Sequence, residues 1–208
     1  MKNIRQEVLV DIGLRVLSCL CVAYFVVSVF ATFKADTSRI SVLAAGFSEV
    51  ATIVVSIFSR RPAARDWSPF SVAAVVYSAG FWALLIKFDP HVDLIGQTVA
   101  VATQIAGALW AINAKVTLGR SFGWLPANRG IVDSGVYGIV RHPIYLGYLI
   151  GHLGMLGANF NIQNLIALAL LYVCQIYRIF QEEKFLMADE RYRNYAQRVP
   201  YRLIYGLF

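Results

Sequence analysis

Residues 12–33 read IGLRVLSCLCVAYFVVSVFATF and contain a single charged side chain, Arg15. A helix needs about 20 mostly apolar residues to cross the hydrocarbon core of a bilayer. Lys2 and Arg5 precede the run, as basic residues do in a signal peptide. The run is too long for the apolar part of such a peptide, and no small-residue cleavage site closes it. We therefore expect an uncleaved membrane-spanning helix.

Five further apolar runs follow along the chain. They cover residues 40–58, 70–88, 95–118, 144–158 and 162–180. The run 144–158 is short and would rise only about 22 Å as a helix, so we expect it to tilt or to begin beneath the membrane surface. The chain is 58% hydrophobic and 15% charged, whereas soluble domains carry about 25% charged residues. These features predict an all-α, polytopic membrane protein with about six membrane-embedded helical segments.

The basic residues predict the orientation of these helices. We place the N-terminus, residues 59–69, residues 115–143 and the C-terminal tail on one side. That side then holds all but three of the 19 lysines and arginines, the exceptions being Lys34, Arg39 and Lys87. Cytoplasmic loops are enriched in Lys and Arg, so we expect both termini in the cytoplasm, with the chain in a bacterial inner membrane. The net charge of +7 thus reflects topology and does not indicate nucleic-acid binding.

Residues 181–198 are charged and favour a helix, which Pro200 ends. One face of this helix is apolar and consists of Phe185, Leu186, Tyr192 and Tyr195. We expect a cytoplasmic C-terminal helix that leaves the last span and then lies along the membrane surface.

Four polar side chains within the earlier apolar runs are candidates for a functional role. They are Glu49, Gln104, Asn113 and Lys115. An ionisable group inside a membrane is a functional candidate, but a protonated Glu49 bonded to a neighbouring helix explains that residue more simply. Gln104 can join helices by hydrogen bonds, and Lys115 can extend its ammonium group towards the cytoplasm. We favour structural roles for all four.

Small residues recur in the fifth and other runs. Gly147, Gly151, Gly154 and Gly157 lie in the fifth run, and the first two have the spacing of closely packed membrane helices. For Gly147, a close approach of the backbone to a ligand is the alternative.

The three cysteines are Cys19, Cys21 and Cys174. They lack the spacing of metal ligands, and we expect small buried apolar residues and no metal site.

Residues 134–147, SGVYGIVRHPIYLG, are the most informative stretch. Pro143 is suited to the first position of a helix, which places His142 at a helix N-terminus. Free N–H groups and the helix dipole favour an anion there. Arg141 adds a positive charge, and Tyr145 lies about one turn along the helix. The stretch predicts a site for a carboxylate or phosphate and a flat ring, although an ordinary Arg-His pair at the membrane boundary also explains it.

Residues 178–186, RIFQEEKFL, are the second informative stretch. Arg178 and Glu182 are four residues apart and share a helical face. Glu183 lies about 140° from Arg178 around the helix, so the two glutamates must have different roles. The stretch suits a cationic or ribose-bearing ligand, and the alternative is a solvated charge cluster where the helix leaves the bilayer.

Taken together, these stretches resemble the isoprenylcysteine carboxyl methyltransferase family and its bacterial relatives. The resemblance covers residues 118–208. It rests on the segments Leu118–Trp124, Gly135–Tyr137, Arg141–Gly147, Arg178–Leu186 and Tyr192–Ile204, in the order and spacing of that family. One departure is Tyr205, where the relatives usually have proline, and it affects the conformation of the last four residues.

The resemblance implies an S-adenosylmethionine-dependent methyltransferase. Its cofactor would enter from the cytoplasm, and a lipophilic or lipid-modified acceptor would enter from the bilayer lipids. By motif position, the cofactor-binding residues would be His142, Tyr145, Leu146, Gly147, Glu182 and Glu183. Arg141, Arg178 and Glu183 match positions that the family needs for activity. We expect one membrane domain, 1–208, with N-terminal transmembrane helices in 1–117, a methyltransferase-like part in 118–208, and the two motif stretches folded into one cavity.

Three alternatives remain open. Carboxyl O-methylation is favoured, but an amine or a thiol acceptor is also compatible with the resemblance. NADPH-dependent sterol reductases have a similar C-terminal layout, but their motif places Asn directly before the Tyr, where this chain has Ile144. A non-enzymatic scaffold or transporter subunit would be expected to show paired interrupted half-repeats, and this chain has one such segment, 143–157.

Overall fold

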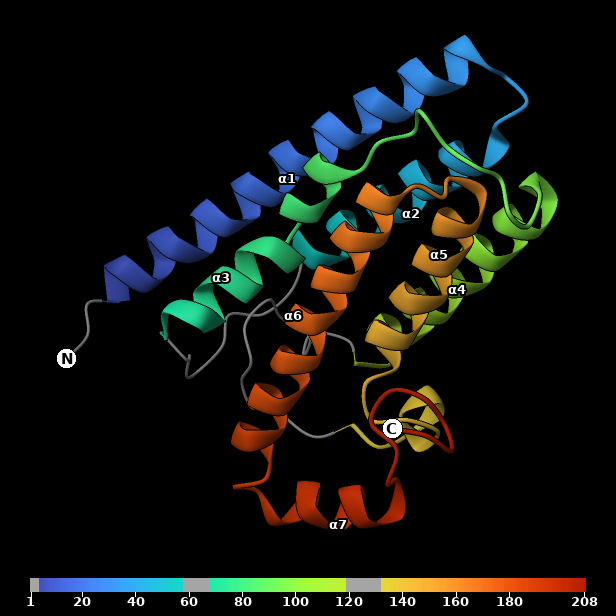
Figure 1. Ribbon diagram of the computed structural model, residues 1–208. Coiled ribbons are helices and arrows are strands. Elements are labelled where there is room, and N and C mark those ends of the chain that lie inside the picture. The colour runs from blue at the N-terminus through green and yellow to red at the C-terminus, as the bar shows by residue number, and fades with distance from the viewer. Residues whose placement is uncertain (1–3, 58–67, 119–131) are drawn as a thin grey trace.

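The computed structural model describes residues 4–57, 68–118 and 132–208, which fold almost entirely as helices (Figure 1). The longer helices are α1 (Ile4–Ala35), α2 (Ile40–Ile57), α4 (Gln97–Leu118), α5 (Pro143–Ala158) and α6 (Ile162–Leu186). The shorter ones are α3 (Pro69–Ser78), α7 (Glu190–Arg198) and the 3₁₀ helices η1 (Phe81–Leu85) and η3 (Gly135–Gly138). No β-strand forms among the described residues, and a single bridge pairs Val92 with Phe160. The expectation of an all-α fold is confirmed for this part of the chain.

Within residues 4–57, 68–118 and 132–208, three helices are long and apolar enough to cross a membrane. They are Ile12–Ala35 within α1, Gln97–Leu118 and Ile162–Leu186. Two shorter apolar helices are Ile40–Ala51 and Pro69–Ser78. Large apolar side chains project outward from these helices at intervals of three or four residues, as at Val16, Leu20 and Val27 of α1. Apolar stripes of this kind suit contact with lipid rather than water.

The third apolar run does not form the single helix expected over residues 70–88. Helix α3 ends at Ser78, and η1 begins at Phe81 after a break at Gly80. Gly80 has φ 141°, a conformation that favours glycine. A Cβ at Gly80 would lie 3.1 Å from Cys21 Cβ, so the break also lets the chain approach α1 closely. The expectation was wrong because the chain turns inward here and buries Trp82 against Phe25.

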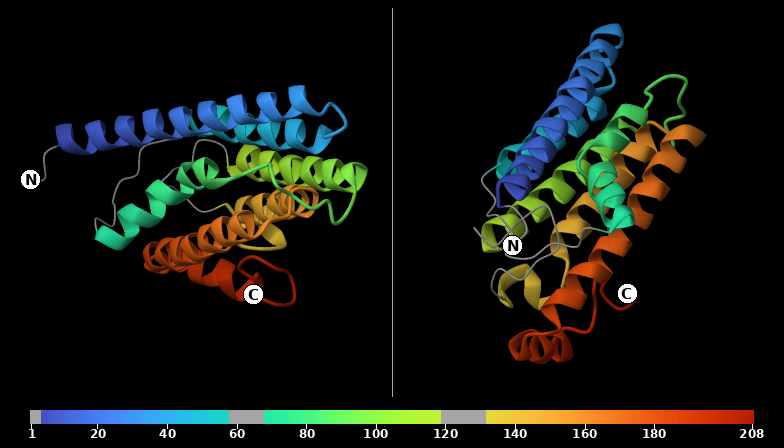
Figure 2. Two further views of the ribbon diagram at one scale, coloured as in Figure 1. Left: turned by 45° about the horizontal axis from the view of Figure 1, so that its top comes forward. Right: turned by 90° about the vertical axis from the view of Figure 1, so that its left-hand side faces the viewer.

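Each of the longer helices packs against at least two other helices. Helix α2 lies between α1 and α4, α5 runs along α4, and α3 packs on α6 (Figure 2). Glycines bring α4 and α5 together. A Cβ at Gly107 would lie 2.6 Å from the carbonyl oxygen of Gly147, and a Cβ at Gly147 would lie 2.7 Å from Ala111 N. The small-residue pattern of α5 therefore serves close helix packing, as expected.

Loops and termini gather at two ends of the helix bundle (Figure 1). The end that we call the motif end holds residues 132–142, α7 and the C-terminal tail. The other end, which we call the opposite end, holds the α1–α2 turn, residues 86–96 and the α5–α6 turn. Several residues used in the topology argument and in the resemblance lie outside the described residues, namely Arg60, Arg61, Arg65, Arg120, Arg129 and segment 119–124.

Arg39, one of the three basic residues assigned to the opposite end, is buried. Its guanidinium group donates to Phe88 O at 2.7 Å, to Asn159 Oδ1 at 2.8 Å and to Asp89 Oδ1 at 3.0 Å. Asn164 donates from Nδ2 to Asn159 O at 2.8 Å. These bonds join the α1–α2 turn to residues 86–89 and to the α5–α6 turn. Arg39 therefore stabilises the opposite end from within.

The last apolar run continues beyond residue 180, as expected. Helix α6 extends to Leu186, and Asp189 caps α7 by accepting a bond from Arg191 N at 2.9 Å. Helix α7 lies across the end of α6 (Figure 1). Tyr192 and Tyr195 are buried, and Leu186 packs against the same apolar cluster. The stretch predicted as one helix over 181–198 is thus two helices, because the chain turns at 187–189. Of the predicted apolar face, Leu186, Tyr192 and Tyr195 share a cluster, and its contact with a membrane surface stays a prediction.

Candidate active site

Glu183, on α6, is the centre of a buried cluster at the motif end. Arg202 donates from Nε to Glu183 Oε2 at 2.8 Å, and Tyr192 donates from its hydroxyl to Oε1 at 3.4 Å. His142 Nε2 lies 3.3 Å from Oε1. Arg141 Nε lies 3.0 Å from the same oxygen, at ion-pair distance but without the alignment of a hydrogen bond. Four side chains from three separate segments thus surround one carboxylate, and the two informative stretches of sequence lie against each other.

Glu182 has different surroundings. Its Oε2 accepts a bond from the Tyr145 hydroxyl at 3.3 Å and lies 3.8 Å from His142 Nδ1. Its side chain is 20% exposed, compared with 6% for Glu183. The Arg178 guanidinium lies over the Tyr145 ring, 5.6 Å from its centroid, in a cation–π arrangement. The prediction that the two glutamates have separate surroundings is confirmed, and Glu182 is the more accessible one.

The C-terminal tail completes the cluster. The N–H of Arg141 donates to Tyr201 O at 2.9 Å, and the N–H of His142 donates to Arg202 O at 2.8 Å. The Arg202 guanidinium also lies over the rings of Phe180 and Phe208, at 5.4 and 5.5 Å. The tail therefore fixes both the backbone of the motif and the carboxylate of α6. Arg202 lies in a segment that carries the resemblance, but the sequence did not predict it as a site residue. No local pattern distinguishes it from the other arginines of the tail.

Local sequence positions His142 and Tyr145. Pro143 is the first residue of α5, as expected, and His142 precedes it with φ −123° and ψ 59°. The His142 side chain makes no capping bond to the helix. Its ring instead lies against the carboxylate of Glu183. The first N–H groups of a helix lack partners within it, and in α5 Pro143 has none to offer.

Three buried tyrosines, Tyr137, Tyr192 and Tyr195, pack together beside the motif. The Tyr195 hydroxyl donates to Tyr137 O at 2.8 Å and so holds η3 against α7. Burial raises the pKa of Tyr137, Tyr192 and Tyr195 above the ordinary range. All three phenols therefore stay neutral near pH 7, and the hydroxyls of Tyr192 and Tyr195 donate hydrogen bonds.

The remaining predicted residues lie nearby. Leu146 packs against the buried cluster of Tyr145, Ile179 and Leu203. Gly147 is on the side of α5 that faces α4, as its contacts with Ala111 show. The structure thus brings six of the eight predicted residues into one charged cluster and places Leu146 beside them. Direct contact of Leu146 or Gly147 with a cofactor stays a prediction.

The charges of the cluster do not cancel. It contains three arginines, Arg141, Arg178 and Arg202, and two glutamates, Glu182 and Glu183. The arginines of the cluster therefore outnumber its glutamates by one. Positive potential in a partly buried site attracts a carboxylate and disfavours an ammonium group.

Comparisons with known proteins agree with this chemistry. Residues 94–194 match the family model described as phospholipid methyltransferase. Over 139 residues, the chain is 32% identical to a protein-S-isoprenylcysteine O-methyltransferase of Schizosaccharomyces pombe, covering 62% of this chain and 57% of that protein. Over 105 residues, it is 37% identical to protein-S-isoprenylcysteine O-methyltransferase B of Arabidopsis thaliana, covering 46% of this chain and 53% of that protein. The chain spans about half the length of these relatives.

Proposed function

We propose that the chain belongs to the membrane methyltransferase family that includes the isoprenylcysteine carboxyl methyltransferases, to which it is similar over part of its length, and that it methylates the carboxylate of a lipophilic acceptor. An isoprenylated cysteine is the model acceptor, and S-adenosylmethionine is the proposed methyl donor. The observation that supports this most strongly is the enclosure of Glu183 by Arg141, His142 and Arg202. That contact assembles the motif, α6 and the tail into one site.

The described residues fit the proposed donor, which supplies a methyl group on a positively charged sulfonium. Glu182 is a partly exposed carboxylate beside the Tyr145 hydroxyl, a pair suited to ribose hydroxyls or to an ammonium group. The N–H groups of Ile144 and Tyr145, in the first turn of α5, are proposed to face a carboxylate. We assign cofactor binding to His142, Tyr145 and Glu182, with Leu146, Gly147 and Glu183 adjoining them.

The acceptor carboxylate is proposed to lie near Arg178, with Arg141 close by. Methyl transfer from a sulfonium to a carboxylate neutralises two opposite charges, so a pocket of low dielectric favours the transition state over separated ions. Arg178 would hold the carboxylate in line, and stacking on Tyr145 limits its own movement. No base is needed, because a carboxylate acceptor has no proton to lose.

Glu183 is then a positioning residue. Its two oxygens already meet Arg141, His142, Tyr192 and Arg202, which orients these groups and leaves it poorly suited to accept a proton. A protonated amine or a thiol acceptor would require such a base. The engagement of Glu183 and the excess of arginines over glutamates both favour O-methylation over N- or S-methylation.

The chain is an integral membrane protein with at least three apolar helices of spanning length among its described residues. We further propose that α2, the α3–η1 segment and α5 are embedded too, giving six segments in one domain over residues 1–208. In this arrangement 1–117 holds the N-terminal transmembrane helices, and 118–208 is the methyltransferase-like part. Both termini and the motif end would face the cytoplasm of a bacterial inner membrane. The donor would enter from the cytoplasm and the acceptor from the lipids.

Direct binding tests this proposal against the reductase alternative, which the comparisons do not favour. Purified protein in detergent should bind S-adenosylhomocysteine with measurable heat and should not bind NADPH. Binding of NADPH alone would contradict the assignment. A scaffold or transporter subunit would bind neither.

Labelling tests the acceptor. The protein is incubated with methyl-labelled S-adenosylmethionine and either an isoprenylated cysteine or a total lipid extract. A methyl ester releases labelled methanol in base, whereas methylated amines and thioethers do not. We expect the label to be released in base. Label that is stable in base would contradict O-methylation and indicate N- or S-methylation.

A further inference from the structure

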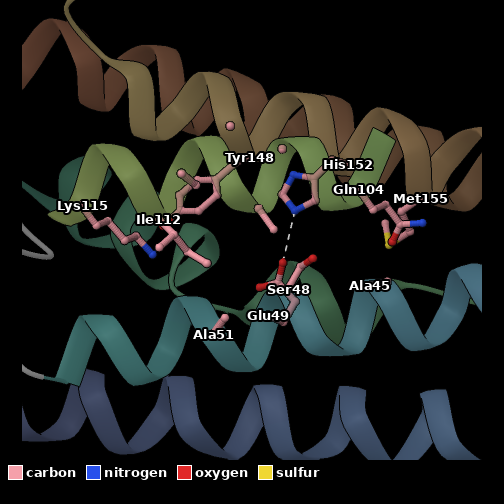
Figure 3. Close-up of a pocket in the computed structure, with 15 residues that line it drawn as sticks. Ala45, Ser48, Glu49, Ala51, Gln104, Ile112, Lys115, Tyr148, His152 and Met155 are labelled. Atoms are coloured by element: carbon pink, nitrogen blue, oxygen red, sulfur yellow. Dashed lines mark ion pairs between the residues drawn. The ribbon is translucent and has the colours of Figure 1, made fainter. Parts of the chain in front are cut away.

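A recess lies between α2, α4 and α5, further along α5 from the motif end than the charged cluster (Figure 3). Four alanines, three glycines, Ile112 and Met155 make most of its wall apolar. Six side chains with polar groups also line it. They are Ser48, Glu49, Gln104, Lys115, Tyr148 and His152. The methyltransferase chemistry proposed above uses none of them.

The His152 ring is held in place from three sides. Its Nε2 lies 3.5 Å from Glu49 Oε1, across the recess from α5 to α2 (Figure 3). Its Nδ1 lies 2.8 Å from the Tyr172 hydroxyl on α6. Trp82 packs against the ring at 4.6 Å between centroids. The ring is therefore oriented before any ligand arrives.

Gln104 points to a ligand. Its side chain is 1% exposed and lines the recess, yet neither its Nε2 nor its Oε1 has a hydrogen-bond partner among the described residues. Buried amide groups are nearly always hydrogen-bonded, because an unmade bond in an apolar setting is unfavourable. A ligand group that both accepts and donates a hydrogen bond would satisfy this amide.

The recess adjoins the candidate active site along one face of α5. His142, Tyr145, Tyr148 and His152 follow one another on this face at intervals of three or four residues. Their ring centroids are separated by 5.8, 6.5 and 6.4 Å in turn. Tyr145 and His152 are seven residues apart, which corresponds to about 10 Å along the helix. One extended molecule can therefore reach both places.

The ionisable groups of the recess already face other side chains. Glu49 lies against His152, and Nζ of the buried Lys115 lies 5.1 Å from the centroid of the Tyr148 ring. Burial of a further charge in an apolar setting is unfavourable without a partner, whereas a neutral polar group needs only hydrogen bonds. A hydroxyl is neutral, donates one hydrogen bond and accepts others.

We propose that the recess binds a hydroxyl group carried on the lipid part of the methyl acceptor, while the carboxylate that receives the methyl group lies in the charged cluster. This inference rests on the proposed function. It refines the substrate class, because a plain isoprenyl chain is a hydrocarbon and has no group to satisfy Gln104. The recess would then select hydroxylated acceptors over plain ones.

Two synthetic probes test the proposal. One is N-acetyl-S-farnesylcysteine, and the other is the same compound with a hydroxyl on the middle isoprene unit. Binding of each to the full-length protein is measured by calorimetry in the presence of S-adenosylhomocysteine. We expect the hydroxylated probe to bind about tenfold more tightly, as one newly satisfied buried polar group allows.

Variants assign that difference to the recess. Gln104→Leu should abolish the preference while binding the plain probe normally. Thr98→Val, on an exposed position of the same helix, is the matched control and should retain the preference. His152→Phe should also reduce the preference, and binding of S-adenosylhomocysteine reports whether each variant is folded.

The outcomes separate the two proposals. Equal affinity for the two probes, or an equal effect of Gln104→Leu on both, would overturn the recess assignment while leaving the methyltransferase in place. Failure of both probes to bind a protein that binds S-adenosylhomocysteine would also overturn it. If the unmodified protein binds no S-adenosylhomocysteine, the proposed function fails, and the recess assignment fails with it.

Discussion

Arg202 donates from Nε to Glu183 Oε2 at 2.8 Å and thereby joins the C-terminal tail to the last long helix. The tail also accepts backbone bonds from Arg141 and His142. The candidate site is therefore built from three segments, and the last of them lies within seven residues of the C-terminus. The tail is part of the site as much as the motif is.

Replacement of Arg202 tests this role. Arg202→Gln removes a charge-assisted bond to a buried carboxylate, which is worth about 1.5–3 kcal/mol. We expect kcat/KM for methyl transfer to fall about 10- to 100-fold. Arg198→Gln is the control, because Arg198 forms an exposed pair with Asp133 and should leave kcat/KM nearly unchanged. Equal effects of the two substitutions would argue against a specific role for Arg202.

Glu183→Gln and Arg178→Ala should each abolish methyl transfer. The first leaves Arg141 and Arg202 facing a neutral amide, and the second removes the proposed anchor of the acceptor carboxylate. Turnover is measured with labelled donor, and expression and membrane insertion are followed by immunoblot and should persist. Arg60→Ala, assigned only to topology, serves as the control. A Glu183→Gln, Arg178→Ala double variant with normal turnover would remove the proposed site.

Two glycines on α5 offer a matched test of helix packing. A Cβ at Gly147 would lie 2.7 Å from backbone atoms of α4, whereas a Cβ at Gly151 would meet only Gln104 O, at 4.0 Å. Gly147→Ala should therefore separate α4 and α5 and cost about 1–3 kcal/mol, while Gly151→Ala should be close to neutral. Thermal unfolding in detergent distinguishes them. A lower melting temperature for Gly151→Ala alone would contradict the packing described here.

The buried tyrosines predict a loss of stability in alkali. Burial raises the pKa of Tyr137, Tyr192 and Tyr195 in the folded protein, whereas in the unfolded chain the pKa is about 10. Their contribution is complete below about pH 10 and decreases as pH rises, because the unfolded chain then loses protons that the folded protein retains. Tyr195→Phe should flatten the decrease in melting temperature between about pH 9 and pH 11. Tyr205→Phe, at an exposed position, should not.

Arg39 should stabilise the opposite end. Arg39→Gln removes bonds to Phe88 O, Asp89 and Asn159 and leaves buried acceptors unpaired, so we expect a loss of about 2–4 kcal/mol. Lys34→Gln changes the same charge at an exposed position and should alter stability little. The two melting temperatures are compared in detergent. Similar values would mean that Arg39 acts only through membrane topology.

Sequence by itself determined the helices and the principal site residues. Apolar runs of sufficient length predict α1, α4 and α6, because hydrophobic length is a property of consecutive residues. Pro143 also predicts the start of α5, because a proline restricts the backbone locally and suits the first position of a helix. The resemblance predicts His142 and Glu183 as site residues, although the two lie in separate stretches of the sequence.

Only the tertiary structure decided which distant residues meet. Arg202 reaches Glu183, Arg39 reaches Asn159 and His152 reaches Glu49, and each pair is far apart in the chain. The break at Gly80 is also a tertiary effect, because it accompanies close contact with α1. Burial and pairing of polar groups depend on how helices pack against one another, and no pattern of neighbouring residues records that arrangement.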